Sequence, residues 1–393
     1  MPLLDFWDSK PDTVQNMSLK QIVANAGDGN LKDGSDASVE LREYFAQVSI
    51  EKLGEYVEFC LSYPFNDSGF VLQDLVNELG NRLEYDVDWG RYRGVKGKVG
   101  ADGVWRAPEG VDVIVEVKTS DSYRINLDVI AGYRDQLASE EVIGKKSSIL
   151  LVVGRQDTGD FEAQIRGSKH AWDIRIISAD ALVKLAELKI ASEEDDTLVK
   201  IRSLLTPFEY TRLDNIIDIV FTTAADVEKT KDTSFVDQSM ENVRAMDKTS
   251  PDIIKETRAR IISAASKNMQ TSLVAKSQAL YWSKDKSVRV ACTVSKRYDG
   301  THYWYAYHAS WDAFLASEMA FMIFGCVDMN VAFVIPIDDF RQQVKYLHTT
   351  RRKDGGEYWH IHIHELKDNQ FIMKLPKANK DYDLAGYMMA ISE

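Results

Sequence analysis

Apolar residues recur along this chain with two different periods, and the change of period separates the expected helices from the expected strands. From 68 to 84 the apolar side chains keep the helical spacing i, i+3, i+4 and i+7, at Leu72, Leu75, Val76, Leu79 and Leu83. From 111 to 120 the sequence VDVIVEVKTS is dense in β-branched residues, which favour a strand. The first segment predicts an amphipathic helix and the second predicts a largely buried strand.

Beyond this strand the alternation of periods continues. We expect helix, strand, helix, strand and helix over 126–137, 147–154, 160–171, 172–178 and 179–189. Asn126 is a suitable N-cap for the first of these helices. Glycine-rich turns before the long strand bound a hairpin whose second strand ends at Trp105. Alternating helices and strands predict an α/β fold with the later strands roughly parallel, and the hairpin makes the sheet mixed.

The regions on either side have a different character. Residues 1 to about 35 contain the run AGDGNLKDGSDAS and are expected to be loop, whereas 39–61 has helical spacing. Residues 224–250 are polar without a sustained period, and the sequence from 273 onward is rich in aromatic and β-branched residues. We therefore divide the chain into a helical extension (1–67), an α/β domain (68–222), a linker (223–250) and a smaller β-rich, α+β domain (251–393).

Composition and charge mainly exclude classes of protein. The formal charge is −13, so a uniformly basic nucleic-acid-binding surface is excluded and any phosphate contact needs a local basic patch. Cys60, Cys292 and Cys326 are widely spaced, as expected in a reducing cytoplasm. No segment has the pattern of a secretion signal or a membrane span, and neither GxxxxGK[ST] nor GxGxxG occurs. We expect a cytoplasmic protein without a membrane contact, in which any ATP is used by another chain.

The strand over 111–120 carries the candidate chemistry. Side chains alternate faces along a strand, so Glu116 and Lys118 share a face inside an apolar run, where charged groups are costly to bury without a partner or a function. Asp102 comes from the preceding hairpin strand, which the turn over 106–110 folds back beside Glu116. These two carboxylates, with the backbone carbonyl of Val117 facing the same point, are hard oxygen ligands that suit Mg²⁺ or Mn²⁺.

A site of this composition suits hydrolysis of a phosphate ester. The ion would lower the pKa of a water and hold a phosphate in line with it, while Lys118 orients or deprotonates the water or neutralises the developing charge. Asp112 lies about 13 Å along the strand from Glu116, at ~3.3 Å per residue, and is expected to cap the strand end instead. The alternative interpretation is a structural ion pair between Glu116 and Lys118, or between each of them and its neighbours.

Asp102 followed by Glu116-Val117-Lys118, on a β-branched strand after a leading helix and a hairpin, resembles the PD-(D/E)xK, or restriction-endonuclease-like, superfamily of nucleases. The resemblance covers roughly residues 68–190. It implies a mixed sheet flanked by helices and a divalent-metal-dependent nuclease site. Asp102 and Glu116 would hold the ion, and Lys118 would assist the water.

The leading helix departs from the family pattern. Many members carry a glutamate there that points into the site, and the matching position is Gln73, with Asn77 one turn later on the same side. The neutral amide of Gln73 would support a bound water but contribute less to holding an ion, which puts a second metal ion in doubt. Glu78 is the rival if the register of the helix differs.

Basic and polar side chains near this site are candidates for contacting a nucleic-acid backbone. The segment WGRYRGVKGK, over 89–98, contains no acid and four bases, Arg91, Arg93, Lys96 and Lys98. After the Glu-Val-Lys strand come Tyr123, Arg134 and Gln136, and the resemblance implies that a Gln or Tyr of this region lies near the metal or the phosphate. The alternatives are a solvated hairpin and an ordinary helix surface.

Two further patterns lie in the β-rich region. His360, His362 and His364 share one face of a strand, where neighbouring histidines either chelate a transition metal or form a polar surface. An aromatic run from Tyr298 to Trp311 packs a β core or stacks on bases. We expect the polar surface and the core.

The function we expect is that of a Mg²⁺- or Mn²⁺-dependent DNA endonuclease. The style of both halves resembles effector nucleases of bacterial restriction or anti-phage and anti-plasmid defence, and a Lamassu-type effector controlled by a separate ATPase or sensor subunit is compatible. Symmetric cutting of duplexes would require a homo-oligomer. The alternatives are a catalytically weak DNA-binding protein on a nuclease fold and an assembly subunit whose β-rich domain is the working part.

Overall fold

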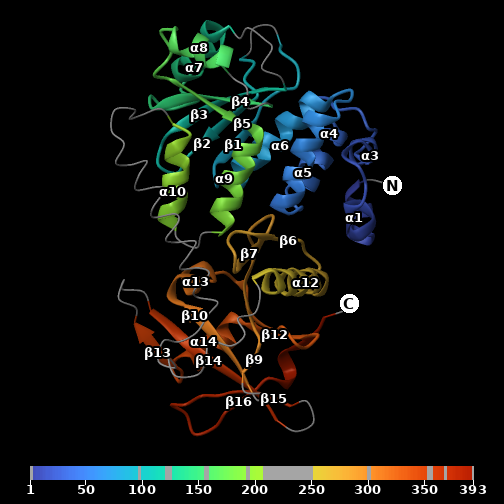
Figure 1. Ribbon diagram of the computed structural model, residues 1–393, viewed down its shortest axis with the longest axis vertical. Coiled ribbons are helices and arrows are strands. Elements are labelled where there is room, and N and C mark those ends of the chain that lie inside the picture. Colours follow the sequence, from blue (N-terminus) through green and yellow to red (C-terminus); the bar gives the residue numbers. More distant parts are fainter. Residues whose placement is uncertain are drawn as a thin grey trace. The chain divides into compact units, whose positions relative to one another are not determined.

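The chain divides into two compact units, Met1–Ala224 and Ala225–Glu393. The computed structural model describes residues 3–95, 99–119, 126–154, 159–191, 195–206, 251–298, 302–351, 357–366 and 370–391, with the side chains of 159–161, 195–196 and 251–252 excepted. The expected linker, 223–250, lies outside these residues. The fold is mixed α/β, with helices at the N-terminus, a mixed sheet after them and a β-rich region with two sheets at the C-terminus (Figure 1).

The first unit begins with a group of helices. They are α1 (Leu3–Ser9), α2 (Pro11–Gln15), α3 (Leu19–Asn25), α4 (Asp36–Phe45) and α5 (Ile50–Ser62). The expectation of loop over residues 1–35 is therefore wrong for most of that segment. Leu3, Leu19 and Ile22 are almost fully buried and join the core formed by α4 and α5. Helices α1, α2 and α3 are each too short to show a sustained period, and their stability comes mainly from tertiary packing.

The described strands of the first unit form a five-stranded sheet in the order β1-β2-β3-β4-β5. Their bounds are β1 (Asp86–Trp89), β2 (Gly103–Arg106), β3 (Asp112–Lys118), β4 (Ser147–Val153) and β5 (Ile174–Ser178). The pairs β1–β2 and β2–β3 are antiparallel, and β3–β4 and β4–β5 are parallel. The expected mixed sheet, with a hairpin followed by parallel strands, is confirmed.

Helices cover both faces of this sheet, as Figure 1 shows. They are α6 (Ser68–Arg82), α7 (Leu127–Ser139), α8 (Gly159–Arg166), α9 (Ala179–Ala191) and α10 (Asp195–Leu204). Val113 and Val115 of β3 pack in the core that includes α6 and α9, whereas Ile114 packs in the core that includes α7. Strand β3 is thus buried on both faces, and each such aliphatic side chain contributes roughly 1.5–3 kcal/mol to stability. Asn126 caps α7 as expected, because its side chain accepts a hydrogen bond from the Val129 amide.

The described strands of the second unit form two sheets. One has the order β16-β15-β14-β10-β9, with β13 also paired to β14, and the other has the order β17-β12-β11-β8-β7-β6. The first contains β9 (Arg297–Tyr298), β10 (His302–His308), β13 (His348–Arg351), β14 (Glu357–Glu365), β15 (Phe371–Met373) and β16 (Tyr382–Asp383). The second contains β6 (Leu273–Ala275), β7 (Leu280–Ser283), β8 (Val288–Ser295), β11 (Met319–Cys326), β12 (Val331–Pro336) and β17 (Met388–Ala390).

The two sheets enclose a core rich in aromatic residues. Tyr303, Tyr305 and Tyr307 of β10 pack there with Phe324 of β11 and Phe333 of β12. The helical elements of this unit are α12 (Pro251–Met269), α13 (Ala309–Phe314), α14 (Ile337–Val344) and the 3₁₀ turn η3 (Ala385–Tyr387). Helix α12 packs in a second core on the outer face of β8 and β11. The expected β-rich region with a few helices is confirmed.

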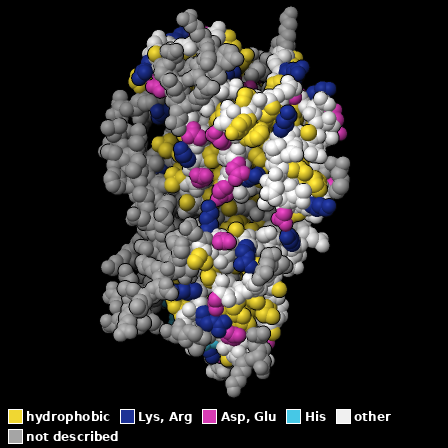
Figure 2. Space-filling view, turned by 45° about the vertical axis from the view of Figure 1, so that its right-hand side comes forward, with side chains coloured by type: hydrophobic (Ala, Val, Ile, Leu, Met, Phe, Trp, Pro, Cys, Tyr) yellow, Lys and Arg dark blue, Asp and Glu magenta, His cyan; other side chains and the backbone are white. Residues whose placement is uncertain are grey.

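The state of the cysteines, the polarity of the helices and the distribution of surface charge can be compared with what the composition predicts. All three cysteines are buried and free. None of the described helices is long and apolar enough to cross a membrane. On the face drawn in Figure 2, acidic and basic side chains are interspersed and neither sign forms a continuous field.

Candidate active site

Asp102 and Glu116 lie opposite each other at the end of the β2–β3 pair. Gly103 pairs with Val115, so the next residues outward, Asp102 and Glu116, face each other across the two strands. The Asp102 amide donates to the Val115 carbonyl at 3.0 Å, and the Asp102 Oδ2 atom accepts from the Val117 amide at 2.7 Å. The turn at 107–110 thus folds the hairpin as the sequence predicts. The observed contact of Val117 with Asp102 is made by its amide.

Lys118 completes a charged group with the two carboxylates. Its Nζ atom lies 2.5 Å from Glu116 Oε1, and its side chain is 30% exposed, compared with 11% for Glu116. The second carboxylate oxygen, Glu116 Oε2, is buried and has no hydrogen-bond partner among the described residues. An anionic oxygen in this position is costly unless a cation or a donor joins it.

The electrostatics of the group favour a neutral Asp102 and a charged Lys118. Burial, and next the negative charge of Glu116, raise the pKa of Asp102 to about 7, against the opposing effects of the Val117 amide and Lys118. Burial lowers the pKa of Lys118, but Glu116 and Asp102 outweigh it and the net shift is upward. Without a further cation, this site therefore holds a proton on Asp102 near neutral pH.

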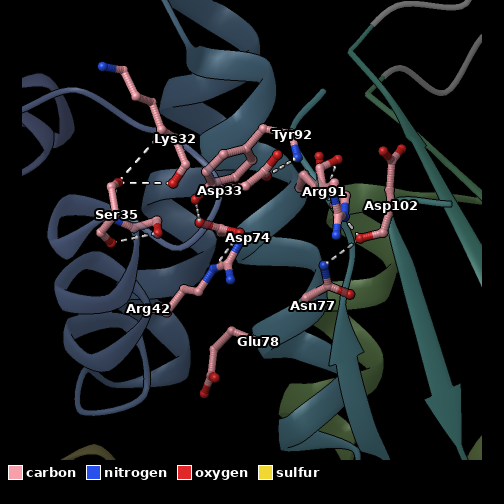
Figure 3. Close-up of polar contacts among 12 residues, drawn as sticks. Lys32, Asp33, Ser35, Arg42, Asp74, Asn77, Glu78, Arg91, Tyr92 and Asp102 are labelled. Atoms are coloured by element: carbon pink, nitrogen blue, oxygen red, sulfur yellow. Dashed lines mark hydrogen bonds and ion pairs between the residues drawn. The ribbon is translucent and has the colours of Figure 1, made fainter. Parts of the chain in front are cut away.

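Helix α6 holds Asp102 through its backbone. The carbonyl oxygen of Asp102 accepts hydrogen bonds from Gln73 Nε2 at 3.1 Å, from Asn77 Nδ2 at 2.9 Å and from the Gly90 amide at 3.0 Å. Figure 3 shows Asn77 reaching this carbonyl while the carboxylate of Asp102 points the other way. Gln73 thus supports Asp102 from the opposite side of the sheet, because α6 packs on the face of Val113 and Val115 and the charged group lies on the face of Ile114.

Close packing at Gly103 makes this support possible. The Asn77 Oδ1 atom accepts a hydrogen bond from the indole of Trp105 at 2.9 Å, so this one amide ties two residues of the hairpin to α6. A Cβ atom at Gly103 would lie 2.2 Å from Asn77 Oδ1, which no side chain allows without a shift. The glycine after Asp102 is therefore required by the approach of the helix.

Two other acids considered from the sequence have structural roles. Glu78 is buried and pairs with Arg82 at 2.6 Å, and Figure 3 shows it pointing away from Asp102. Glu78 is therefore excluded as a rival ligand. Asp112 accepts a hydrogen bond from the Gly144 amide at 2.6 Å, which confirms its expected place at the strand end.

The described part of the basic segment is anchored by its aromatic residues. Tyr92 is buried, its hydroxyl donates a short hydrogen bond to Asp74, and its amide donates to Asp33 Oδ1 at 2.7 Å. Arg42 lies 4.7 Å from the ring centroid of Trp89 and pairs with Asp74 at 3.0 Å. Tyr92 and Trp89 are therefore fixed inward, against the N-terminal helices and α6.

Arg91 and Arg93 flank Tyr92 and are exposed. The carbonyl of Arg91 accepts from Gln73 Nε2 at 3.4 Å, so the segment that carries these cations is attached to the same helix as Asp102. The guanidinium of Arg93 lies 6.0 Å from the ring centroid of Phe70. Lys96, Lys98 and Tyr123, the other predicted nucleic-acid contacts of this region, lie outside the described residues.

The two remaining predicted contacts, on α7, are engaged elsewhere. Arg134 pairs with Asp173 at 3.0 Å and with Asp135 at 3.1 Å, and Gln136 donates to Glu140 at 2.8 Å. These contacts match the alternative of an ordinary helix surface. Tyr133 of α7 lies near the site, since it contributes to the electrostatic surroundings of Lys118 and a Cβ atom at Gly100 would lie 3.2 Å from its hydroxyl.

The donor set fits a hard divalent cation in part. Two carboxylates come from adjacent strands, one of their oxygens is buried with no hydrogen-bond partner among the described residues, and the charge of Glu116 acts on Asp102. Against this, the described residues contain no group of three or more His, Cys, Asp or Glu side chains that could hold a metal. Asp102 and Glu116 therefore fit one ion that keeps water or phosphate oxygens as its other ligands, as Mg²⁺ commonly does.

Comparison with models of known protein families gives no match, and comparison with curated protein sequences gives none either. The case for a function therefore depends on the geometry above.

Several residues that support this site were not identified from the sequence. Asp33, Arg42 and Asp74 act together around Tyr92, yet they are far apart along the chain, and in sequence each resembles an ordinary charge of a helix or loop. The one available signal was Asp74, a carboxylate on the apolar side of a helix between Leu72 and Leu75. Asp74 is fully buried, and burial raises its pKa to about 7 despite the Arg42 charge.

Proposed function

We propose that this protein is a metal-dependent DNA endonuclease of the PD-(D/E)xK type. The observation that carries the proposal is that Asp102, next to the end of the β2–β3 ladder, lies within the electrostatic reach of Glu116 and Lys118, and that one Glu116 oxygen is buried without a described partner. A leading helix, a hairpin, the strand that carries Glu116 and two following parallel strands surround this group in the order that the superfamily resemblance requires.

Asp102 and Glu116 would hold a Mg²⁺ or Mn²⁺ ion. When bound, such an ion supplies Lewis-acid stabilisation of charge on a phosphate oxygen and lowers the pKa of a water. Lys118 keeps its proton, because the neighbouring carboxylates raise its pKa, and so it acts as a fixed positive charge toward the reacting phosphate rather than as a base. Gln73 and Asn77 hold the backbone of Asp102, and Arg91 and Arg93 position the nucleic-acid backbone.

The biological setting we propose is bacterial defence, as the effector nuclease of a restriction or anti-phage or anti-plasmid system, with a Lamassu-like system as one possibility. The acidic charge, −13, suits a nuclease that is recruited and controlled by partners better than one that binds DNA alone. A separate ATPase or sensor subunit would supply that control, and a homo-oligomer would provide paired cuts of a duplex.

Plasmid cleavage with Mg²⁺, Mn²⁺ or EDTA tests this function. Metal-dependent nicking or linearisation is expected, and Asp102→Asn, Glu116→Ala and Lys118→Ala should each lower the rate by at least about 100-fold. Asp86→Asn on β1 and Lys146→Ala before β4 make the same changes of charge at exposed positions and should leave the rate unchanged. Cleavage that survives in EDTA or in Glu116→Ala would refute the proposed site.

A second function is favoured by one specific observation, that no third acid joins Asp102 and Glu116 among the described residues. Because Gln73 replaces an acid and Glu116 already pairs with Lys118, the site also suits a protein that binds DNA, or joins an assembly, with little or no cleavage. Retarded plasmid without cleavage, in the presence of the proposed partners, would support this second function.

A further inference from the structure

The outer face of one sheet in the second unit gathers imidazole and aromatic rings. Strands β10 and β14 pair in a register that places His302 opposite His364, Trp304 opposite His362 and His308 opposite Tyr358. On the neighbouring strand β13, His348 lies opposite His360. Six of the seven histidines of the chain lie on this surface, and the seventh is His170 in the first unit. The ring face consists of Tyr298, His302, Trp304, His308, His348, Tyr358, His360, His362 and His364.

Strand parity separates this face from the core. Tyr303, Tyr305 and Tyr307, at the alternate positions of β10, are at most 1% exposed and lie between the two sheets, as do Ile361 and Ile363 of β14. Of the described residues, none that forms the ring face belongs to a hydrophobic core of the unit. Most of them are partly exposed, His348 is exposed, and His360 is buried. The aromatic run from Tyr298 to Trp311 therefore divides between the core and the outer face of the sheet.

The rings contact one another side by side. The His302 and His364 rings are stacked, with centroids 5.1 Å apart and planes 14° apart, and the centroids of Tyr358 and His360 are 5.0 Å apart. This stacking does not converge the ring nitrogens, and no group of His, Cys, Asp and Glu among the described residues could hold a metal. Burial and the surrounding histidines lower the pKa of His362 to about 4, so this ring is uncharged at neutral pH.

The ring face also lacks acids, although the chain as a whole is acidic. No Asp or Glu occupies any of its positions on β9, β10, β13 or β14. Two lysines border it. Lys296 lies 5.9 Å from the Tyr298 ring centroid, and the Lys374 amide donates to the His362 carbonyl at 2.8 Å. The side chain of Lys374 pairs with Asp381 at 2.7 Å, and Asp383 lies opposite Ile372 at the β15–β16 edge, so these two acids stand at that edge. A polyanion that approaches over β9, β10, β13 and β14 therefore meets rings rather than carboxylates.

We propose that the ring face binds single-stranded nucleic acid by stacking bases on its imidazole and indole rings. Planar and partly exposed rings on one sheet face suit unpaired bases, whereas the bases of a duplex already stack on each other and are inaccessible to a flat surface. The site is in the second unit and uses none of the residues assigned to cleavage. It does not depend on the proposed endonuclease activity.

A matched pair of substitutions on β13 tests the proposal. His348→Glu places a carboxylate on the ring face, whereas Thr349→Glu adds the same charge at the next residue, which is also exposed but points to the opposite side of the sheet. The full-length protein would be titrated in EDTA into fluorescent oligothymidylate and oligouridylate and into a duplex, with binding followed by anisotropy. We expect single strands to bind more tightly than the duplex. His348→Glu should weaken their binding about tenfold or more, and Thr349→Glu should change it less than about twofold.

A second pair removes rings instead of adding charge. Trp304→Ala on the ring face should weaken single-strand binding about tenfold, and Trp282→Ala, in the other sheet of the same unit, should not. Equal losses within either pair, tighter binding of the duplex, or no binding of single strands would overturn the proposal. A change of oligomeric state in His348→Glu, seen by size exclusion, would instead make the face a protein interface and would also overturn it. Both members of each pair keep Asp102, Glu116 and Lys118, so failure of the nuclease proposal leaves this comparison intact.

Discussion

At the scale of single residues, the two acids of the site owe their properties to the strands beside them. Asp102 immediately precedes β2 and Glu116 lies on β3, so their charges interact in a setting from which water is partly removed. Burial, and next the charge of Glu116, raise the pKa of Asp102 from its ordinary value of 3.8 to about 7 in the free site. An incoming cation must therefore displace a proton below that pH.

Binding of Mn²⁺ should consequently depend on pH. Below about pH 7 the apparent affinity is expected to fall by up to about tenfold per pH unit, because the ion competes with the proton on Asp102, and above pH 7 it should level off. Isothermal titration with Mn²⁺ between pH 6 and 8 measures this dependence. Asp102→Asn should bind weakly with a much smaller pH dependence, and an unchanged slope in that variant would show that another group titrates.

Asn77 should support both stability and activity. In Asn77→Ala the buried indole NH of Trp105 and the Asp102 carbonyl each lose a partner, which should cost roughly 1–3 kcal/mol of unfolding free energy and slow any cleavage. Asn81→Ala, one turn further along α6, removes only a contact with Glu78 and is the matched control. Urea denaturation of both variants gives the comparison, and equal losses would contradict the assigned role.

At the scale of elements, the N-terminal helices complete the site region. Asp33 and Arg42 contact the segment that carries Arg91 and Arg93, and α6 contacts both that segment and Asp102. The helical extension is therefore part of the same structure as the sheet. Its first three helices, α1 to α3, are too short for a helical period to predict them, whereas the spacing over 39–61 predicts the helical character of α4 and α5.

Loss of the Asp33 contact should loosen this segment. In Asp33→Ala the Tyr92 amide loses its acceptor, so amide exchange over 89–95 should accelerate about tenfold or more, while exchange in β3 remains unchanged. Hydrogen exchange followed by mass spectrometry measures both regions. Asp8→Ala removes an exposed acid of α1 and serves as the control for charge. Exchange over 89–95 that matches the wild type would show that Tyr92 is held by its hydroxyl alone.

At the scale of the whole molecule, each unit contains a group whose pKa is shifted in the folded protein, and the two shifts have opposite directions. In the first unit, burial raises the pKa of Asp102 to about 7, so the folded state holds more protons than the unfolded one between about pH 4 and 7, and this contribution to stability falls as pH rises. In the second unit, burial lowers the pKa of His362 from 6.5 to about 4, so its contribution is present above about pH 6.5 and is lost as pH falls.

The difference in unfolding free energy between each variant and the wild type, plotted against pH, should show these two opposite dependences. Relative to wild type, Asp102→Asn should become progressively more stabilising as pH rises from about 4 to 7. His362→Gln should gain relative stability as pH falls from about 6.5 to 4, each by roughly 1–3 kcal/mol. Differential scanning calorimetry of the metal-free protein across this range measures both. Parallel curves for the two variants would contradict the assigned pKa directions.

Some elements of this fold can be predicted from the sequence, and others cannot. The helix at 68, the hairpin, β3 and the helix capped by Asn126 were all predicted, because each has a period or a turn signal of its own. The pairing of Asp102 with Glu116 followed from the hairpin alone. The contacts of Gln73 did not, because the face of the sheet on which α6 packs depends on the whole arrangement of layers.

The sequence by itself determined which residues alternate, where the chain turns, and hence that two acids and a lysine meet at one end of β3. Only the tertiary structure decided that Gln73 approaches from the opposite side, that Tyr92 is buried rather than exposed, and that the histidines of three strands form one surface. The physical reason is the distance along the chain between the residues that interact. Periods, caps and turns are set by neighbours along the chain, whereas burial, pKa values and shared surfaces are set by residues that only folding brings together.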